Sequence, residues 1–170
     1  ADCFAKSYAI DTTAGKTALY LGQALGAQGK TEEAIEAFKH AAWNGEEANA
    51  NKQISNIYLK SSQVSLKSQK YANAIKEAEL ANSFHESANA YYIAGQASQK
   101  LSKNADAIKY FEKYLEMSPN AKNAPTVTFT VAVLYQDMKN NAKALEFYKK
   151  VQDDPKFGAQ AKQMIASLSK

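Results

Sequence analysis

The chain has 170 residues, 45% of them hydrophobic, with seven Gly and three Pro, and this composition excludes a disordered chain and allows a substantial core. No apolar run approaches the ~20 residues needed to cross a bilayer, so no membrane insertion is expected. The net charge is +4, but all 21 basic residues are Lys. Because Arg supplies the planar group that reads guanine edges and phosphates, nucleic acid is not an expected partner.

Residues 1–13 predict a short helix followed by a turn. Counted back from Gly22, Phe4 stands at the aromatic place and Ser7 at the small-residue place of a preceding helix, and Asp11-Thr12 falls at the turn. No apolar segment preceded by Lys stands in this stretch, so we expect that an export signal was either removed or never existed. The single cysteine, Cys3, excludes an intrachain disulfide.

Residues 14–47 predict two helices joined by a turn. In the second helix, Ala34, Phe38 and Ala41 are spaced by four and then three residues, which puts them on one stripe of small and apolar side chains. Gly29 and Gly45 mark the turns, because glycine adopts tight or left-handed backbone without a clash at Cβ.

The stripe of this second helix recurs three times further along the chain. Its alanine anchors are Ala34, Ala74, Ala107 and Ala144, which are 40, 33 and 37 residues apart. These separations indicate a unit of about 34 residues with short insertions in two of them. We therefore predict helical pairs over residues 14–47, 48–87, 88–121 and 122–154.

Each pair needs a short side chain on its first helix, because two helices approach closely only where a side chain is small. Leu21-Gly22, Ala94-Gly95 and Val131-Ala132 supply it in three pairs. In the pair over 48–87 two registers remain open. Either Ile54-Ser55 with Tyr58 makes the contact and an insertion lies near residues 62–69, or there is no gap and the first helix is about two turns longer than usual.

Proline marks the ends of the last two pairs. Pro119 and Pro155 each end one helical pair and start the next element, since proline cannot continue a helix. Residues 155–170 carry Ala161 and Ile165 in an amphipathic pattern with Lys between the apolar positions. This segment predicts a helix that caps the last apolar face of the array.

These residues resemble the tetratricopeptide-repeat (TPR) pattern of W-x-x-L-G-x-x-Y followed by A, F, A and P, over nearly the whole chain. Trp43 is not at the tryptophan place of that pattern. The resemblance implies an all-α fold, a right-handed α-α superhelix of about four helical pairs with a C-terminal capping helix, as a single domain over 1–170. It also places 1–13 on the second helix of a half-repeat, which is either an N-terminal cap or the end of an upstream segment.

The resemblance also implies a protein-protein interaction scaffold, in which the first helix of each pair lines a concave groove for a peptide or partner protein. An amide recurs on successive first helices, and amides both donate to and accept from a peptide backbone. Two other interpretations stay open: the amides are simply solvated, and the two aromatic residues belong to the core. The groove places correspond to Lys16, Leu19, Gln23, Asn56, Gln63, Asn89, Tyr92, Gln96 and Phe129.

No catalytic, metal or cofactor site is expected, and the chain is not predicted to be an enzyme. His40, His85 and Cys3 belong to different repeats, so they do not form a zinc cluster. Gly15-Lys16-Thr17 ends like a nucleotide-binding loop but lacks its earlier glycine and preceding strand. The carboxylate clamp of some similar domains is not expected either, because Leu19 stands where its first Lys would be.

Two rival functions remain at this level: a structural or homo-oligomerisation module, and a regulatory region of a larger protein. The Lys-only composition, rich in Asn and Gln, is similar to that of exported bacterial repeat proteins. This similarity favours a periplasmic or cell-envelope location over the cytoplasm.

Overall fold

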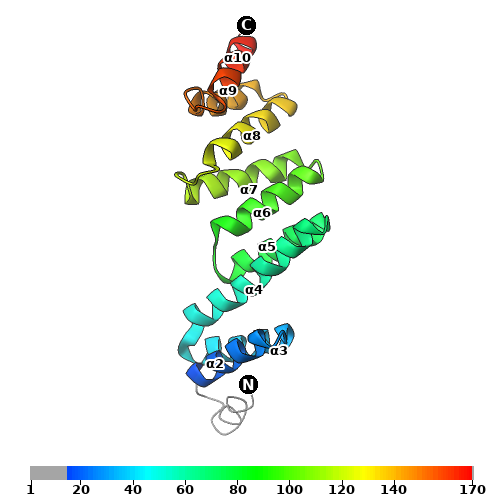
Figure 1. Ribbon diagram of the computed structural model, residues 1–170, viewed down its shortest axis with the longest axis vertical. Coiled ribbons are helices and arrows are strands. Elements are labelled where there is room, and N and C mark those ends of the chain that lie inside the picture. Colours follow the sequence, from blue (N-terminus) through cyan, green and yellow to red (C-terminus); the bar gives the residue numbers. More distant parts are fainter. Residues whose placement is uncertain (1–14, 170) are drawn as a thin grey trace. The chain divides into compact units, whose positions relative to one another are not determined.

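The computed structural model describes residues 15–169, and this part of the chain contains helices and no strand (Figure 1). Of the described residues, unit 1 comprises 15–61 and 80–86, and unit 2 comprises 62–79 and 87–169. The predicted half-repeat over 1–13 lies outside the described residues. In chain order the helices are α2 (Gly15–Ala27), α3 (Thr31–Ala41), α4 (Glu47–Lys67), α5 (Tyr71–Phe84), α6 (Ala88–Lys100), α7 (Asn104–Met117), α8 (Ala124–Asp137), α9 (Asn141–Lys150) and α10 (Gly158–Leu168).

In unit 1, α2 and α3 lie side by side as the first helical pair (Figure 1). Gly22 of α2 faces the ring of Phe38: a Cβ at Gly22 would lie 2.6 Å from Cε1 of that ring, which is 2% exposed. The missing side chain therefore leaves room for a buried aromatic ring. Ala50 and Ile54 of α4 belong to the same core cluster.

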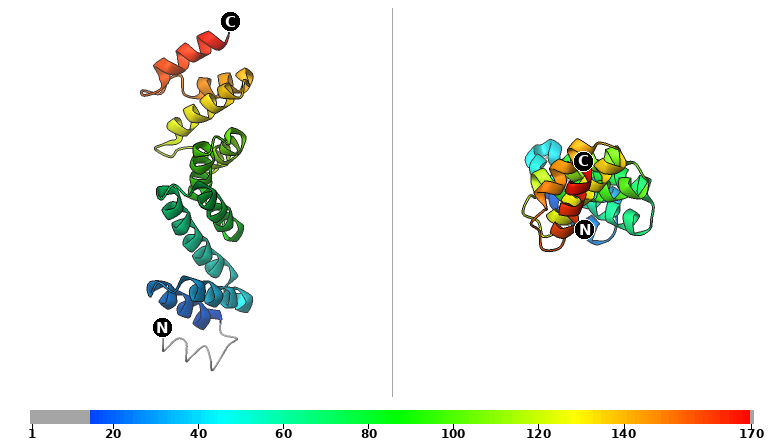
Figure 2. Two further views of the ribbon diagram at one scale, coloured as in Figure 1. Left: turned by 90° about the vertical axis from the view of Figure 1, so that its right-hand side faces the viewer. Right: turned by 90° about the horizontal axis from the view of Figure 1, so that it is seen from above.

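In unit 2, the pairs α6–α7 and α8–α9 pack in the same way, and α10 packs against α9 (Figure 2). A Cβ at Gly95 would lie 2.6 Å from Cδ1 and Cε1 of Phe111. In the next pair, Ala132 and Tyr148 are both buried in the core of this unit. The predicted C-terminal helix is present as α10, with Ala161 fully buried.

The small residue of each first helix stands 12 residues before the alanine anchor of the same pair, and all eight residues are buried. In the second pair the small residue is Ser62. Ala78 stands four residues after the alanine anchor, where Phe38, Phe111 and Tyr148 stand in the other pairs. Ser62 and Ala78 are both completely buried, so small side chains occupy both of these places in the second pair. The small residues are Gly22, Ser62, Gly95 and Ala132.

Helix α4 decides between the two registers that the sequence left open. It runs without interruption over 21 residues, compared with 13 residues in α2 and in α6. The difference is about two turns of helix. The first helix of the second pair is therefore elongated, and residues 62–67 continue α4 instead of forming an inserted loop.

The two helices of every pair are joined by the same turn. One residue in each turn has a positive φ, between 56° and 77°, and it stands five residues before the alanine anchor. The N–H of the following residue then donates to the carbonyl five residues earlier, at 2.9–3.0 Å, as in a Schellman motif. The positive-φ residues are Gly29, Gln69, Ser102 and Lys139.

The junction between α3 and α4 turns at Gly45, whose φ is 94°, as its sequence position predicts. Asn44 closes this junction by donating from its side-chain amide to the carbonyl of His40 at 2.8 Å. Trp43, in the same segment, is 89% exposed. Trp43 therefore does not contribute to the packing of the first helical pair.

Candidate partner-binding surface

The first helices α2, α4, α6 and α8 each bury one side, and the predicted binding residues lie mostly on the other. On α4, Ile54 and Ser62 are buried, whereas Asn56 and Gln63 are exposed. Asn56 and Gln63 are seven residues apart, about two turns, so they share one face of the helix. That face points away from the core.

The same seven-residue spacing recurs on α2 and α6. Lys16 and Gln23 are exposed on α2, and on α6 Asn89 is exposed while Gln96 is half-buried. Measured from the alanine anchors, Gln23, Gln63 and Gln96 occupy equivalent places. An amide therefore stands at one repeated position of three successive first helices, directly after the small residue that contacts the second helix.

Leu19 was predicted to lie on the binding surface, but the structure buries it. It is only 9% exposed and packs in the core of unit 1 with Ala18 and Leu25. A buried leucine cannot offer an apolar pocket to a partner without moving out of the core. The resemblance to TPR proteins assigned Leu19 to the binding groove, but in α2 its side chain packs in the core of unit 1.

Tyr92 of α6 is half-buried and packs among aromatic rings of its own pair. Its ring centroid lies 6.2 Å from that of Phe111 and 5.1 Å from that of Tyr114. Gln96 donates from its side-chain amide to the Tyr92 hydroxyl at 3.1 Å. Packing thus holds the tyrosine in place, and the hydrogen bond in turn orients the amide of Gln96.

Phe129 of α8 occupies the place equivalent to Tyr92 and is also half-buried. Its ring centroid lies 5.4 Å from that of Tyr148 and 5.0 Å from that of Phe157, which stacks on it. Phe129 therefore helps to attach the segment that leads into α10.

Some lysines of the second helices form ion pairs within their own helix, whereas others, such as Lys109 and Lys149, form none with the described residues. On α3, α7 and α9, lysines form ion pairs with glutamates three or four residues away, for example Lys39 with Glu36 at 2.7 Å. This partner holds the pKa of the Glu36 carboxyl below its usual value, first through the hydrogen bond and then through the charge. The first-helix lysines have no such ion pair with the described residues, and they are Lys16, Lys52, Lys60, Lys67 and Lys100.

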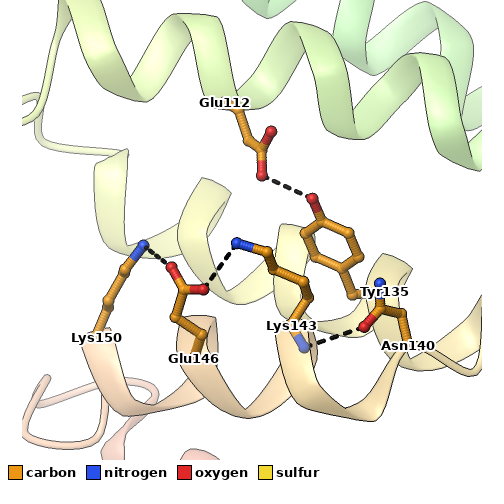
Figure 3. A network of polar contacts seen from close by, with 6 residues as sticks. All are labelled: Glu112, Tyr135, Asn140, Lys143, Glu146 and Lys150. Carbon is orange, nitrogen blue, oxygen red and sulfur yellow. Dashed lines mark hydrogen bonds and ion pairs between the residues drawn. The ribbon is translucent and has the colours of Figure 1, made fainter.

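A second feature, which sequence reasoning missed, is a groove of about 450 Å³ in unit 2 between α7 and α9. Figure 3 shows the polar contacts on its rim: Lys143 and Lys150 both bind Glu146, at 2.9 and 3.0 Å, and Tyr135 donates to Glu112 at 2.8 Å. The glutamate's two partners lower the pKa of the Glu146 carboxyl. The Lys-x-x-Glu-x-x-x-Lys spacing of α9 could have revealed the ion pairs, but not the contact from α8 to α7.

Burial, and then the hydrogen bond to Glu112, raise the pKa of Tyr135 to about 12. The pKa of Tyr110 is raised as well, by burial and then by the bond that its hydroxyl donates to Glu79. Both tyrosines therefore act as neutral hydrogen-bond donors that tie one helical pair to its neighbour within unit 2.

Within residues 15–169, no three His, Cys, Asp or Glu side chains come together in a group that could hold a metal ion. No helix in the described part of the chain is long and apolar enough to cross a membrane.

The tetratricopeptide-repeat family model matches the sequence over residues 19–42 and 88–121. These segments cover the first pair from residue 19 onward and the whole third pair, where Gly22 and Gly95 face the rings of Phe38 and Phe111. The chain contains tetratricopeptide repeats. Its all-α solenoid fold and its family, both predicted from the sequence, are confirmed.

Solved structures share this fold at low sequence identity. A crystal structure of the MamA protein is 22% identical, with 91% of this chain and 80% of that chain covered and a TM-score of 0.57. YrrB, described as a TPR protein with an unusual peptide-binding site, is 17% identical, with coverages of 97% and 81% and a TM-score of 0.52. No protein with a curated description matches the sequence.

Proposed function

We propose that this TPR protein binds an extended segment of another protein on the outward faces of its first helices. The fold supports an interaction scaffold in general, and a protein of the same fold, YrrB, is described as having a peptide-binding site. The observation that carries the proposal is the repeated outward amide, formed by Gln23, Gln63 and Gln96 at equivalent places.

A side-chain amide suits the backbone of an extended peptide, because its NH₂ group donates to a carbonyl and its oxygen accepts from an N–H. Recognition of this kind depends little on the side chains of the peptide. Gln96 is already oriented by its bond to Tyr92, so less side-chain entropy is lost when it binds.

The test is a capture experiment with the purified chain and an extract of the cells that make it. In the binding variant, Gln23→Ala and Gln96→Ala are combined. The control variant combines Asn73→Ala and Gln160→Ala, which remove exposed amides from α5 and α10. We expect specifically captured proteins to be lost from the binding variant and kept by the control. If both variants retain every captured protein, the first-helix surface is not the binding site.

A further inference from the structure

Helix α4 carries a row of positive charge that no carboxylate of the described chain neutralises. Lys52, Lys60 and Lys67 are all exposed, and none forms an ion pair with the described residues. The only acidic residue of α4 is Glu47, at its first position. The positions three and four residues from Lys52 and Lys60 hold no Asp or Glu, so the helix offers these lysines no local partner.

Asn56 and Gln63 alternate with these lysines on the same face. At about 100° per residue, the five side chains fall within an arc of about 80° on the helix surface. The row is about 22 Å long at 1.5 Å per residue. We call this surface the α4 row, and it consists of Lys52, Asn56, Lys60, Gln63 and Lys67.

On the second helices α7 and α9, by contrast, some lysines have a glutamate partner within their own helix. Lys113 pairs with Glu116 at 2.8 Å and Lys143 with Glu146 at 2.9 Å, each within one turn of its own helix. Such pairs cancel the local field. The α4 row instead presents charges of one sign next to hydrogen-bonding amides, on the longest helix of the described chain.

We propose that the α4 row binds an acidic segment of a partner protein, and this inference rests on the proposed function. Carboxylates of the segment would neutralise the lysines, while the amides of the row would bond to its backbone. About seven extended residues are enough to cover the length of the row. The row has no Arg and no aromatic side chain on which bases could stack, so a protein segment fits it better than a nucleic acid does.

The experiment measures binding of defined peptides by fluorescence anisotropy. The probe has about twelve residues, long enough to exceed the row, with alternating Glu and Ser and with both ends blocked. Two reference peptides replace Glu by Gln or by Lys. Blocked ends remove the terminal carboxylate, so binding must come from the acidic side chains.

The test variant combines Lys52→Gln and Lys60→Gln, and the matched control combines Lys109→Gln and Lys149→Gln on α7 and α9. The control lysines are exposed and also lack an ion pair with the described residues, so both variants lose the same charge. Lys and Gln have similar helix propensities, so helicity by circular dichroism should not change. We expect the test variant to bind the acidic peptide about tenfold more weakly and the control about twofold at most. Added salt should weaken binding to the unaltered chain.

Equal losses in the two variants, equal binding of the Glu and Gln peptides, or no binding of the Glu peptide would each overturn the inference. Displacement of the acidic peptide by a single-stranded oligonucleotide that binds more tightly would assign the row to nucleic acid instead. If the acidic peptide does not bind while the capture experiment still depends on Gln23 and Gln96, only the acidic character of the partner is wrong. If neither depends on the first helices, the proposed function fails too.

Discussion

The two glycines one turn apart on α2, Gly22 and Gly26, provide a test of how the helical pairs pack. We consider the changes Gly22→Ala and Gly26→Ala, which add the same methyl group to the same helix. Either alanine gains about 1 kcal/mol over glycine in helix propensity. The two variants therefore differ only in what the new methyl group meets.

At Gly22 the added Cβ would lie 2.6 Å from Cε1 and 2.7 Å from Cδ1 of Phe38, a ring that is 2% exposed. Carbon atoms normally approach no closer than about 3.5 Å, so the ring or the helix must shift by roughly 1 Å. Overpacking of a buried site costs about 1–3 kcal/mol. At Gly26 the nearest atom is Cβ of Ala34 at 3.9 Å, an ordinary contact. The two variants should differ by about 1–3 kcal/mol, with Gly26→Ala the more stable.

The assay is urea unfolding of the two variants and the parent chain, followed by circular dichroism at 222 nm. A Phe38→Leu background removes the ring edge, and in it the gap between the two alanine variants should narrow. Equal stabilities of Gly22→Ala and Gly26→Ala in the parent chain would refute the argument that glycine is required here by the ring of Phe38.

Three further results are expected. Ser102→Gly should raise the free energy of unfolding by about 1 kcal/mol, because φ is 56° at this position and glycine adopts such angles without strain, as urea unfolding would show. Ser98→Ala should also stabilise by about 1 kcal/mol, since the buried Ser98 hydroxyl has no hydrogen-bond partner in the described chain; thermal unfolding measures this. The pKa of Tyr135 is raised from 10.0 to about 12 in the folded state, so the neutral hydroxyl contributes to stability below pH 10. This contribution is lost as the pH rises from 10.0 through about 12. In Tyr135→Phe the free energy of unfolding should therefore fall less over this pH range, as urea unfolding at each pH would measure.

The helical pairs could be predicted from the sequence because their contacts depend on residue size at fixed spacing. Ala34, Ala107 and Ala144 each follow a small residue by 12 positions, and the pattern survives differences in length between the repeats. The turns could not be predicted equally well. Gly29 signals a positive φ, but Ser102 and Lys139 adopt the same backbone without any residue type that marks it.

The candidate surface was predictable in part. The resemblance to TPR proteins assigned Gln23 and Asn89 to the binding surface, and the structure exposes both side chains. A family position does not decide whether an apolar residue at the edge of the buried stripe faces the core or the solvent, and Leu19, expected on the surface, is buried. The bond from Gln96 to Tyr92 depends on a hydroxyl whose position is set by the rings around it. Such a detail needs coordinates.

The uniform turns have a practical consequence for spectroscopy. Their geometry comes from main-chain hydrogen bonds, so exposed side chains beside them, such as Gln28 and Ser68, are free to be exchanged. The chain has one cysteine, and its replacement would leave a background into which two thiol-reactive spin labels could be introduced. Dipolar spectroscopy between labels at these two sites would then report whether the repeats rearrange when a ligand is added.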